Sequence, residues 1–301
     1  MIDMQLEIFL LIAIGYLLTK LNMFTKATRK QLTDIVLGLV LPAATINSFM
    51  INLTPEILST TFVVFCISIA IQFLYMLFNA FLYKNVDEDK RINLKYGTMV
   101  SNAGFMGMPI SQVIFGNTGL LYASIFLIPQ RIFMWSAGLS MYTSTDRKTM
   151  IKSVATHPCI IAIYIGIVCM ALTSFGFVFP VFITKTLSAV GSCNTALSMF
   201  VIGGILSDVD RSDFIDKDCL QYSLVRLIIL PLVILLALKW TPLNATGVGV
   251  CVVLSAMPAA TTTAMLAAKY NRNPEFASKM IFVSTLLSLV TLPIISFLIS
   301  L

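Results

Sequence analysis

Apolar runs separated by short polar segments follow one another along the whole chain. A run of about 20 apolar residues is long enough to cross a bilayer as an α-helix. The pattern predicts an all-α polytopic membrane protein with ten transmembrane helices, of which the longer ones must tilt, bend or protrude. The predicted spans are residues 4–21, 31–51, 58–83, 94–115, 119–143, 154–174, 178–207, 220–239, 245–268 and 277–300.

Composition and charge agree with a chain that lies mostly within lipid. Of the 301 residues, 58% are hydrophobic and 11% are charged, whereas soluble domains carry about 25% charged residues. The mean hydropathy is +0.92. The net charge of +6 does not indicate a nucleic-acid partner, because the basic residues lie in short loops between apolar spans. The predicted surroundings are therefore the lipid bilayer.

The basic residues also predict an orientation. Lys and Arg gather in the loops after the odd-numbered spans, while the even-numbered loops contain only Lys185 and Lys239. Because basic loops face the cytoplasm, both termini are expected outside, in the cytoplasmic (inner) membrane. The residues before the first apolar run include Asp3 but no basic residue, unlike the start of a cleavable signal peptide.

Ten helices divide into two sets of five, and an odd number per set gives the second set the opposite orientation. Gly15 has a counterpart in Gly166, and Pro109 has one in Pro258, at nearly equal separations. These pairs predict two inverted five-helix repeats, residues 1–150 and 151–301.

Two stretches in the middle of apolar spans are rich in small and hydrogen-bonding residues and contain proline. They read SNAGFMGMP (101–109) and SAMPAATTT (255–263). A bilayer tolerates broken helices only where protein or a water-filled cavity satisfies the freed backbone groups. Matching interruptions in the two halves of a chain are typical of a transporter's substrate site; a pair of proline-kinked structural helices is the alternative.

Broken helices of this kind offer a site for an anion. The second half of each helix begins near the bilayer centre, where free N–H groups and the helix dipole favour negative charge. Neighbouring side chains supply further donors. The candidate substrate-binding residues in the two stretches are Ser101, Asn102, Ser255, Thr261 and Thr262, and the candidate hinge residues are Gly104, Gly107, Pro109 and Pro258.

Charged and polar residues elsewhere in the spans add candidates. Arg131 lies near the centre of the fifth span, where a charge costs about 3 kcal/mol, so it must face the protein interior and contact either a substrate carboxylate or freed carbonyls. Arg226 lies a few residues into the eighth span, where it can snorkel to the cytoplasmic face, and a topological or structural role is expected for it. Thr45 and Asn47 of the second span serve either in close helix packing or in the wall of the site.

Several classes of site are disfavoured. The six cysteines form no CxxC pair, and His157 is the only histidine, so no metal or cofactor is predicted. The aspartate-rich loop 208–218 lacks the glycine and the closing glutamate of an EF-hand. No acidic residue lies at the midplane, which disfavours a proton relay and an intramembrane enzyme. Sodium binding by hydroxyls and freed carbonyls stays open.

Four blocks in order carry a family resemblance. They are residues 38–49 (GLVLPAATINSF), 101–110 (SNAGFMGMPI), 197–207 (LSMFVIGGILS) and 255–294, which begins SAMPAATTTAMLAAKYNRNP. The chain resembles the auxin efflux carrier family, which includes plant PIN proteins and bacterial malonate and malate carriers. The similarity covers essentially the whole length.

The resemblance implies a ten-helix fold in which helices 4 and 9 cross as broken helices at Pro109 and Pro258. It also implies an elevator mechanism with scaffold helices 1, 2, 6 and 7 and transport-domain helices 3, 4, 5, 8, 9 and 10. The family's binding positions fall on residues Thr45, Asn102, Gln130, Ser136 and 259–261. The long cytoplasmic loop of many plant members is absent, and Arg131 replaces an uncharged residue, which favours a small, doubly charged acid over an indole acid.

The sequence thus predicts a secondary transporter for a small organic anion, a mono- or dicarboxylate such as malate or malonate. The alternatives are a sodium-coupled symporter of another small solute on a related fold, or a sensor that has kept the fold. The exact substrate, the direction of transport and the coupling ion are left open. A homodimer is compatible with the sequence, because small-residue faces exposed to lipid are ambiguous.

Overall fold

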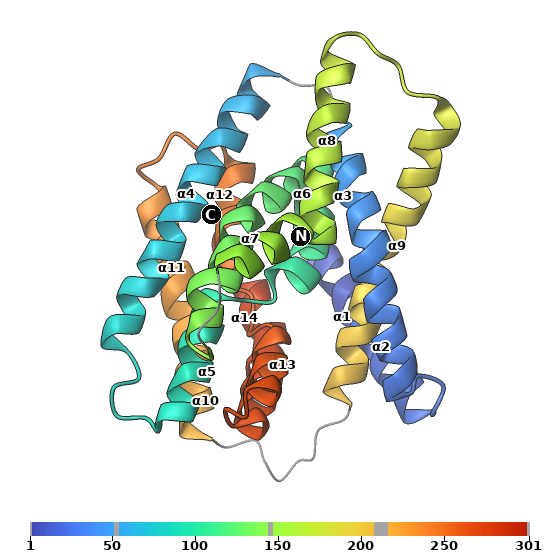
Figure 1. The fold of residues 1–301 in the computed structure, drawn as a ribbon. Coiled ribbons are helices and arrows are strands. Elements are labelled where there is room, and N and C mark those ends of the chain that lie inside the picture. Colours follow the sequence, from blue (N-terminus) through green and yellow to red (C-terminus); the bar gives the residue numbers. More distant parts are fainter. Residues whose placement is uncertain (1, 51–53, 144–146, 208–215, 300–301) are drawn as a thin grey trace.

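A computed structural model describes residues 2–50, 54–143, 147–207 and 216–299, and all regular secondary structure in these ranges is helical (Figure 1). The α-helices are α1 Ile2–Lys20, α2 Lys26–Ile35, α3 Leu41–Phe49, α4 Pro55–Phe81, α5 Glu88–Met99, α6 Met108–Phe133, α7 Arg147–Ala155, α8 Pro158–Ser174, α9 Val181–Leu206, α10 Lys217–Leu224, α11 Leu230–Leu238, α12 Ala245–Ser255, α13 Thr262–Lys269 and α14 Pro274–Ile299. Four π-helical segments connect some of them: η1 Val36–Val40, η2 Ala103–Gly107, η3 Met134–Gly138 and η5 Val225–Ile229.

The prediction of a multi-pass membrane protein is confirmed by the helices themselves. Among the described residues, six helical stretches are long and apolar enough to cross a membrane, and three shorter apolar helices accompany them. The number differs from ten because the first, sixth and ninth predicted spans correspond to the three shorter helices. In addition, the fourth and fifth are joined at Gly116, whose backbone has φ 67° and ψ −157°. The arrangement of ten spans as inverted repeats stays a prediction.

Three of the π-helical segments end two residues before a proline: η1 before Pro42, η2 before Pro109 and η5 before Pro231. A proline has no N–H to donate to the carbonyl four residues back, and its ring crowds that carbonyl. A local shift from the α to the π pattern accommodates both effects, and π-bulges are frequent at functional sites. The sequence therefore places local irregularities in these helices at defined positions.

The helices pack in two groups, which separate in Figure 1 into α1, α2, α3, α8 and α9 on the right and α4, α5 and α10–α14 to the left and below. In the first group α9 packs along α1 and α3, and α3 also packs on α8. The axes of α1 and α9 come very close, because a Cβ on Gly15 would lie 2.2 Å from the Phe200 carbonyl oxygen. In the second group α6 packs on α4 and α12, and α14 packs on α10 and α13.

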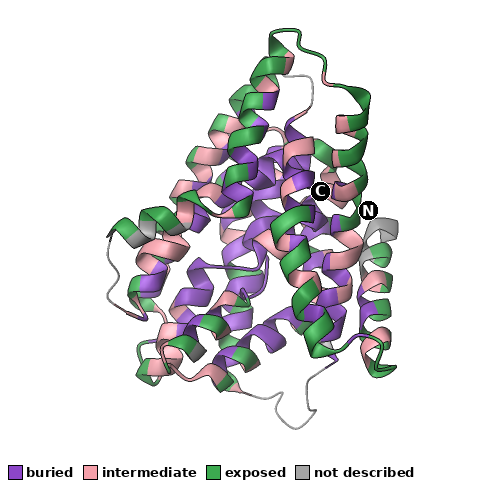
Figure 2. Ribbon diagram, turned by 45° about the vertical axis from the view of Figure 1, so that its right-hand side comes forward, coloured by how far each residue is buried: buried purple, intermediate pink, exposed green. Residues whose placement is uncertain are grey.

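The distribution of buried and exposed residues agrees with this helix packing. Buried residues fill the centre of the bundle, whereas outer helices present exposed faces (Figure 2). Those outer faces carry large apolar side chains such as Phe62 and Phe73 of α4, which is the composition that lipid contact requires.

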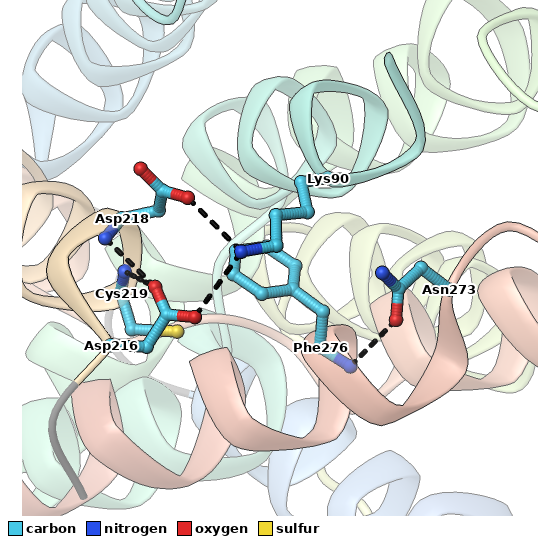
Figure 3. A network of polar contacts seen from close by, with 6 residues as sticks. All are labelled: Lys90, Asp216, Asp218, Cys219, Asn273 and Phe276. Atoms are coloured by element: carbon cyan, nitrogen blue, oxygen red, sulfur yellow. Dashed lines mark hydrogen bonds and ion pairs between the residues drawn. The ribbon is translucent and has the colours of Figure 1, made fainter. Parts of the chain in front are cut away.

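A polar network joins the ends of three helices at one end of the molecule. The loops at 82–87 and 270–273 lie at the lower end of Figure 1, and those at 175–180 and 239–244 lie at or toward the other end. The Lys90 ammonium lies 3.3 Å from an Asp216 carboxylate oxygen and 3.2 Å from one of Asp218 (Figure 3). Lys90 also lies 4.8 Å from the ring centre of Phe276. The network thus connects α5, α10 and α14.

Charge in this network shifts two pKa values. Partial burial disfavours the ammonium of Lys90, but the carboxylates of Asp218 and Asp216 outweigh it and raise the pKa of Lys90. Burial also disfavours the carboxylate of Asp216, yet the backbone N–H groups of Cys219 and Asp218, together with Lys90, hold the pKa of Asp216 below its usual value. Residues 208–215 of the predicted aspartate-rich loop lie outside the described residues.

Candidate functional site

The two predicted helix interruptions are present and lie against each other. The first separates α5 from η2, and the second separates α12 from α13. Ser101 and Ala259 form an antiparallel bridge, and the Asn102 N–H donates to the Pro258 carbonyl oxygen at 2.8 Å. Each interruption therefore satisfies backbone groups that the other has freed, as burial in an apolar interior demands.

Close packing holds the two interrupted helices together. A Cβ on Gly107 would lie 2.6 Å from Leu254 Cδ2 and 3.0 Å from Met257 Cγ. A glycine is needed at this position because the space of a side chain is already occupied. The second half of the first helix therefore begins directly beside the end of α12.

A cavity of about 120 Å³ lies where η2 and α13 begin. A cavity of this size holds several waters or a small solute. Its lining residues are Leu37, Leu41, Val100, Ser101, Asn102, Gly104, Phe105, Leu127, Gln130, Arg131, Met134, His157, Cys159, Ala260, Thr261 and Thr262.

Polar side chains of this lining come from both interruptions and from α6. Gln130 Nε2 donates to the Ser101 carbonyl oxygen at 2.8 Å, which ties α6 to the first interruption. Asn102 and Thr261 are the residues that precede the first turns of η2 and α13. The Thr262 hydroxyl accepts a hydrogen bond from Tyr96 at 3.3 Å. The first N–H groups of a helix have no partner within it, so both helix starts present donors at the cavity.

Arg131 adds a full positive charge to the partial positive charges of the two helix starts. Its side chain is 6% exposed, and its Nη2 lies 3.8 Å from the position that a Cβ on Gly104 would take. Among the described residues, the buried Nη1 of Arg131 has no hydrogen-bond partner. An unsatisfied buried donor is unfavourable by about 1–3 kcal/mol and more when it is charged. Arg131 lines the cavity, so its charge adds to the positive potential there, which suits an anion.

Four predicted binding residues do not line this cavity. Ser255 is fully buried, and its hydroxyl donates to the Cys251 carbonyl oxygen. Thr45 is also fully buried, and Asn47 is half-buried near the end of α3. Ser136 borders a separate space between α7 and α8. The hinge residues Pro109 and Pro258 lie at the interruptions but are not part of the lining.

The lining also contains residues that the sequence did not single out as binding residues. His157 and Cys159 come from the start of α8, and Leu37 and Leu41 come from η1 and α3. The signal in the sequence was the position of His157 next to Pro158, at the start of an apolar span. His157 Nδ1 accepts a hydrogen bond from the Cys159 N–H, so it serves as the helix cap. Among the described residues no group of His, Cys, Asp or Glu is arranged to hold a metal ion.

Arg226 does not snorkel to the cytoplasmic face, although its position in the sequence allowed it. Arg226 is 1% exposed and is the largest fully buried side chain of the described residues. Its Nη1 donates to the Thr98 carbonyl oxygen at 2.9 Å, and its Nε donates to the Met257 carbonyl oxygen at 3.2 Å. The side chain points into the bundle because two carbonyl groups at the helix interruptions are available there.

Comparison with known proteins decides the family. The model of the family described as "Membrane transport protein" matches residues 1–157 and 141–296. The chain belongs to this family. The match agrees with the resemblance to auxin efflux carriers that the sequence blocks indicate.

Two archaeal relatives match this membrane transport protein over nearly their whole length. An uncharacterized transporter of Methanocaldococcus jannaschii is 26% identical over 302 residues, which are 96% of this chain and 96% of that protein. An uncharacterized transporter of Methanothermobacter thermautotrophicus is 26% identical over 304 residues, which are 96% of this chain and 95% of that protein. The chain is thus a multi-pass member of a family of transporters.

Proposed function

We propose that this protein is a secondary transporter that moves a small organic anion, a mono- or dicarboxylate such as malate or malonate, across the cytoplasmic membrane. The observation that carries the proposal is the cavity at the two helix interruptions, where two helix starts and the buried side chain of Arg131 meet. All three features favour negative charge.

The proposed binding mode uses both kinds of positive group. One carboxylate accepts hydrogen bonds from the start of η2 and from Asn102, and Arg131 holds or orients the second carboxylate. Arginine suits this role because its planar guanidinium matches a carboxylate with two parallel hydrogen bonds. Thr261 and Thr262, from the second interruption, contribute hydroxyl groups.

The proposed mechanism is an elevator. In this proposal α1, α2, α3, α8 and α9 form the scaffold, whereas α4, α5, α6 and α10–α14 carry the site and move. The packing supports this division, because α1, α3, α8 and α9 pack mainly on one another. The cavity lies between the groups, since Leu41 and His157 line it from the scaffold side and Arg131 from the other. We further propose that the end of the molecule with the loops at 82–87 and 270–273 faces the cytoplasm. Both termini then lie outside.

The test is thermal stabilisation of the purified protein by a panel of mono- and dicarboxylates. A ligand that binds only the folded state raises the melting temperature by mass action. We expect stabilisation by short dicarboxylates. Loss of a charge-assisted hydrogen bond is worth about 1.5–3 kcal/mol, so Arg131→Gln should weaken binding by roughly 10- to 150-fold. Asn102→Ala should weaken it by a smaller factor.

The matched control is Lys239→Gln, which removes the same charge from an exposed residue and should leave binding unchanged. Unchanged dicarboxylate affinity in Arg131→Gln would remove Arg131 from the site. A flat panel of acids, with stabilisation by a neutral solute that depends on sodium, would replace the proposal with the sodium-coupled symporter.

A further inference from the structure

Arg226 is placed where two interrupted helices end. Thr98, which accepts from its Nη1, lies in the last turn of α5, and Met257, which accepts from its Nε, lies just beyond the end of α12. The guanidinium therefore joins the ends of both first half-helices. Arg131 lines the cavity at the starts of the second half-helices, so the two arginines serve different ends.

The ends that Arg226 joins are negative. The last carbonyl groups of a helix have no partner within it and carry a partial negative charge. In carriers with interrupted helices, such ends and the unwound carbonyls beside them coordinate the coupling cation. Here the guanidinium already donates to one carbonyl at each interruption.

The rest of its surroundings fits a bound cation. The guanidinium carbon lies 4.6 Å from the ring centre of Tyr75 on α4, a distance at which a cation is attracted to the ring face. Within the described part of the chain, no carboxylate forms an ion pair with Arg226. Two backbone carbonyls and an aromatic face therefore stabilise the charge, as they would stabilise a free cation.

We infer that Arg226 is a tethered cation that permanently fills the cation position between the two interruptions. The carrier therefore needs no sodium ion at this position, and the charge there stays constant while the anion loads and leaves. This consequence for coupling rests on the proposed function; the occupied cation position does not. A guanidinium that only fills space would not leave a cation-selective site behind when removed.

The experiment compares cations in the absence of any transported substrate. Wild type, Arg226→Ala, Arg226→Lys and Arg131→Ala are purified as full chains. Their melting temperatures are measured in choline chloride and after replacement of about 10 mM of it by sodium, potassium or guanidinium chloride, a concentration well below that at which guanidinium unfolds proteins. Ionic strength stays constant, so a difference reports binding and not screening.

We expect the wild type to melt at the same temperature in all four salts. Arg226→Ala should melt lower and regain part of the difference with guanidinium or sodium, as mass action requires for a vacated cation site. Arg226→Lys keeps a tethered charge and should stay insensitive to sodium. Arg131→Ala removes a buried arginine as well, but should gain no cation response.

Two results would overturn the inference. One is saturable stabilisation of the wild type by sodium, because the chain would then hold a mobile cation besides Arg226. The other is an Arg226→Ala variant that folds, melts lower and responds equally to every salt. If that variant does not fold, the wild-type and Arg226→Lys measurements still decide, since sodium-dependent melting in either contradicts a filled site. A flat panel of acids would overturn the proposed function alone.

Discussion

Arg131 and Arg226, the buried arginines at the helix interruptions, differ in what surrounds them. Arg226 is 1% exposed and donates to two carbonyl oxygens at the ends of the first half-helices. Arg131 is 6% exposed and lines a cavity at the starts of the second half-helices, and its Nη1 has no hydrogen-bond partner among the residues that the structure describes. The difference separates a charge that the protein's own carbonyl groups satisfy from a charge that, in the proposed function, binds a ligand.

Replacing each arginine with methionine should show the largest difference. Hydrogen bonds to a charged group contribute about 1.5–3 kcal/mol each, so Arg226→Met should lower the free energy of unfolding by roughly 3–6 kcal/mol. Arg131→Met removes a buried donor that has no partner among the described residues, and because such a donor is unfavourable by about 1–3 kcal/mol, the variant should keep or raise the free energy of unfolding. Chemical denaturation in detergent measures both, and equal losses would contradict the distinction.

Gly107 lies where the two interrupted helices pack together, so a substitution there should affect the surroundings of both arginines, with a smaller effect on stability. In Gly107→Ala the new Cβ would meet Leu254 and Met257, and overpacking of this kind costs about 1–3 kcal/mol. The variant should melt lower and bind the anion more weakly, because the two interruptions move apart. The control is Gly38→Ala, since a Cβ there meets nothing within 4 Å. Equal melting temperatures for the two variants would show that the interruptions tolerate separation.

The Lys90 network should show the smallest effect, because it lies partly in solvent. The side chain of Lys90 is 30% exposed, and such ion pairs contribute about 0.2–1 kcal/mol. Lys90→Met should lower the melting temperature slightly, and high salt should reduce the difference between variant and wild type. A loss as large as that of Arg226→Met would mean that the network holds the helices in place.

The pH dependence of this contribution follows from the two shifted pKa values. The pKa of Asp216 is lowered on folding, so its share is present above the ordinary value of 3.8 and is lost as the pH falls through the lowered value. The pKa of Lys90 is raised, so its share is present below 10.5 and is lost as the pH rises through the raised value. Melting curves of wild type and Lys90→Met should converge outside this window.

Sequence patterns predicted the interruptions and much of the cavity because both depend on local chemistry. Proline and small residues within an apolar span define where a helix breaks, so Asn102 and Thr261 follow directly. Arg131 follows from the energetic penalty of an isolated charge in a bilayer. These inferences require the position of a residue along its span but not the face on which it lies.

The residues that the sequence misplaced came from the family resemblance or from position along a span, and neither of these gives the face of a helix or the depth of a side chain. Ser136 lies inside η3 and Thr45 follows η1, and the extra residue of a π-turn rotates every later side chain around the helix. The face of such a residue therefore cannot be read from a period of 3.6. Arg226 was misplaced because proximity to a span end says nothing about the carbonyls and the Tyr75 ring that neighbouring helices supply.

The single-residue turn at Gly116 has a consequence for evolution. Its φ of 67° and ψ of −157° lie in a region that essentially only glycine adopts, and no flexible loop separates the two parts of α6. An inserted or deleted residue there would displace Arg131 relative to Gly104, because both belong to the same continuous hairpin. The loop at 175–180, where Phe175 is 89% exposed, has no such constraint. We expect natural length variation to accumulate at that loop and to be rejected at Gly116.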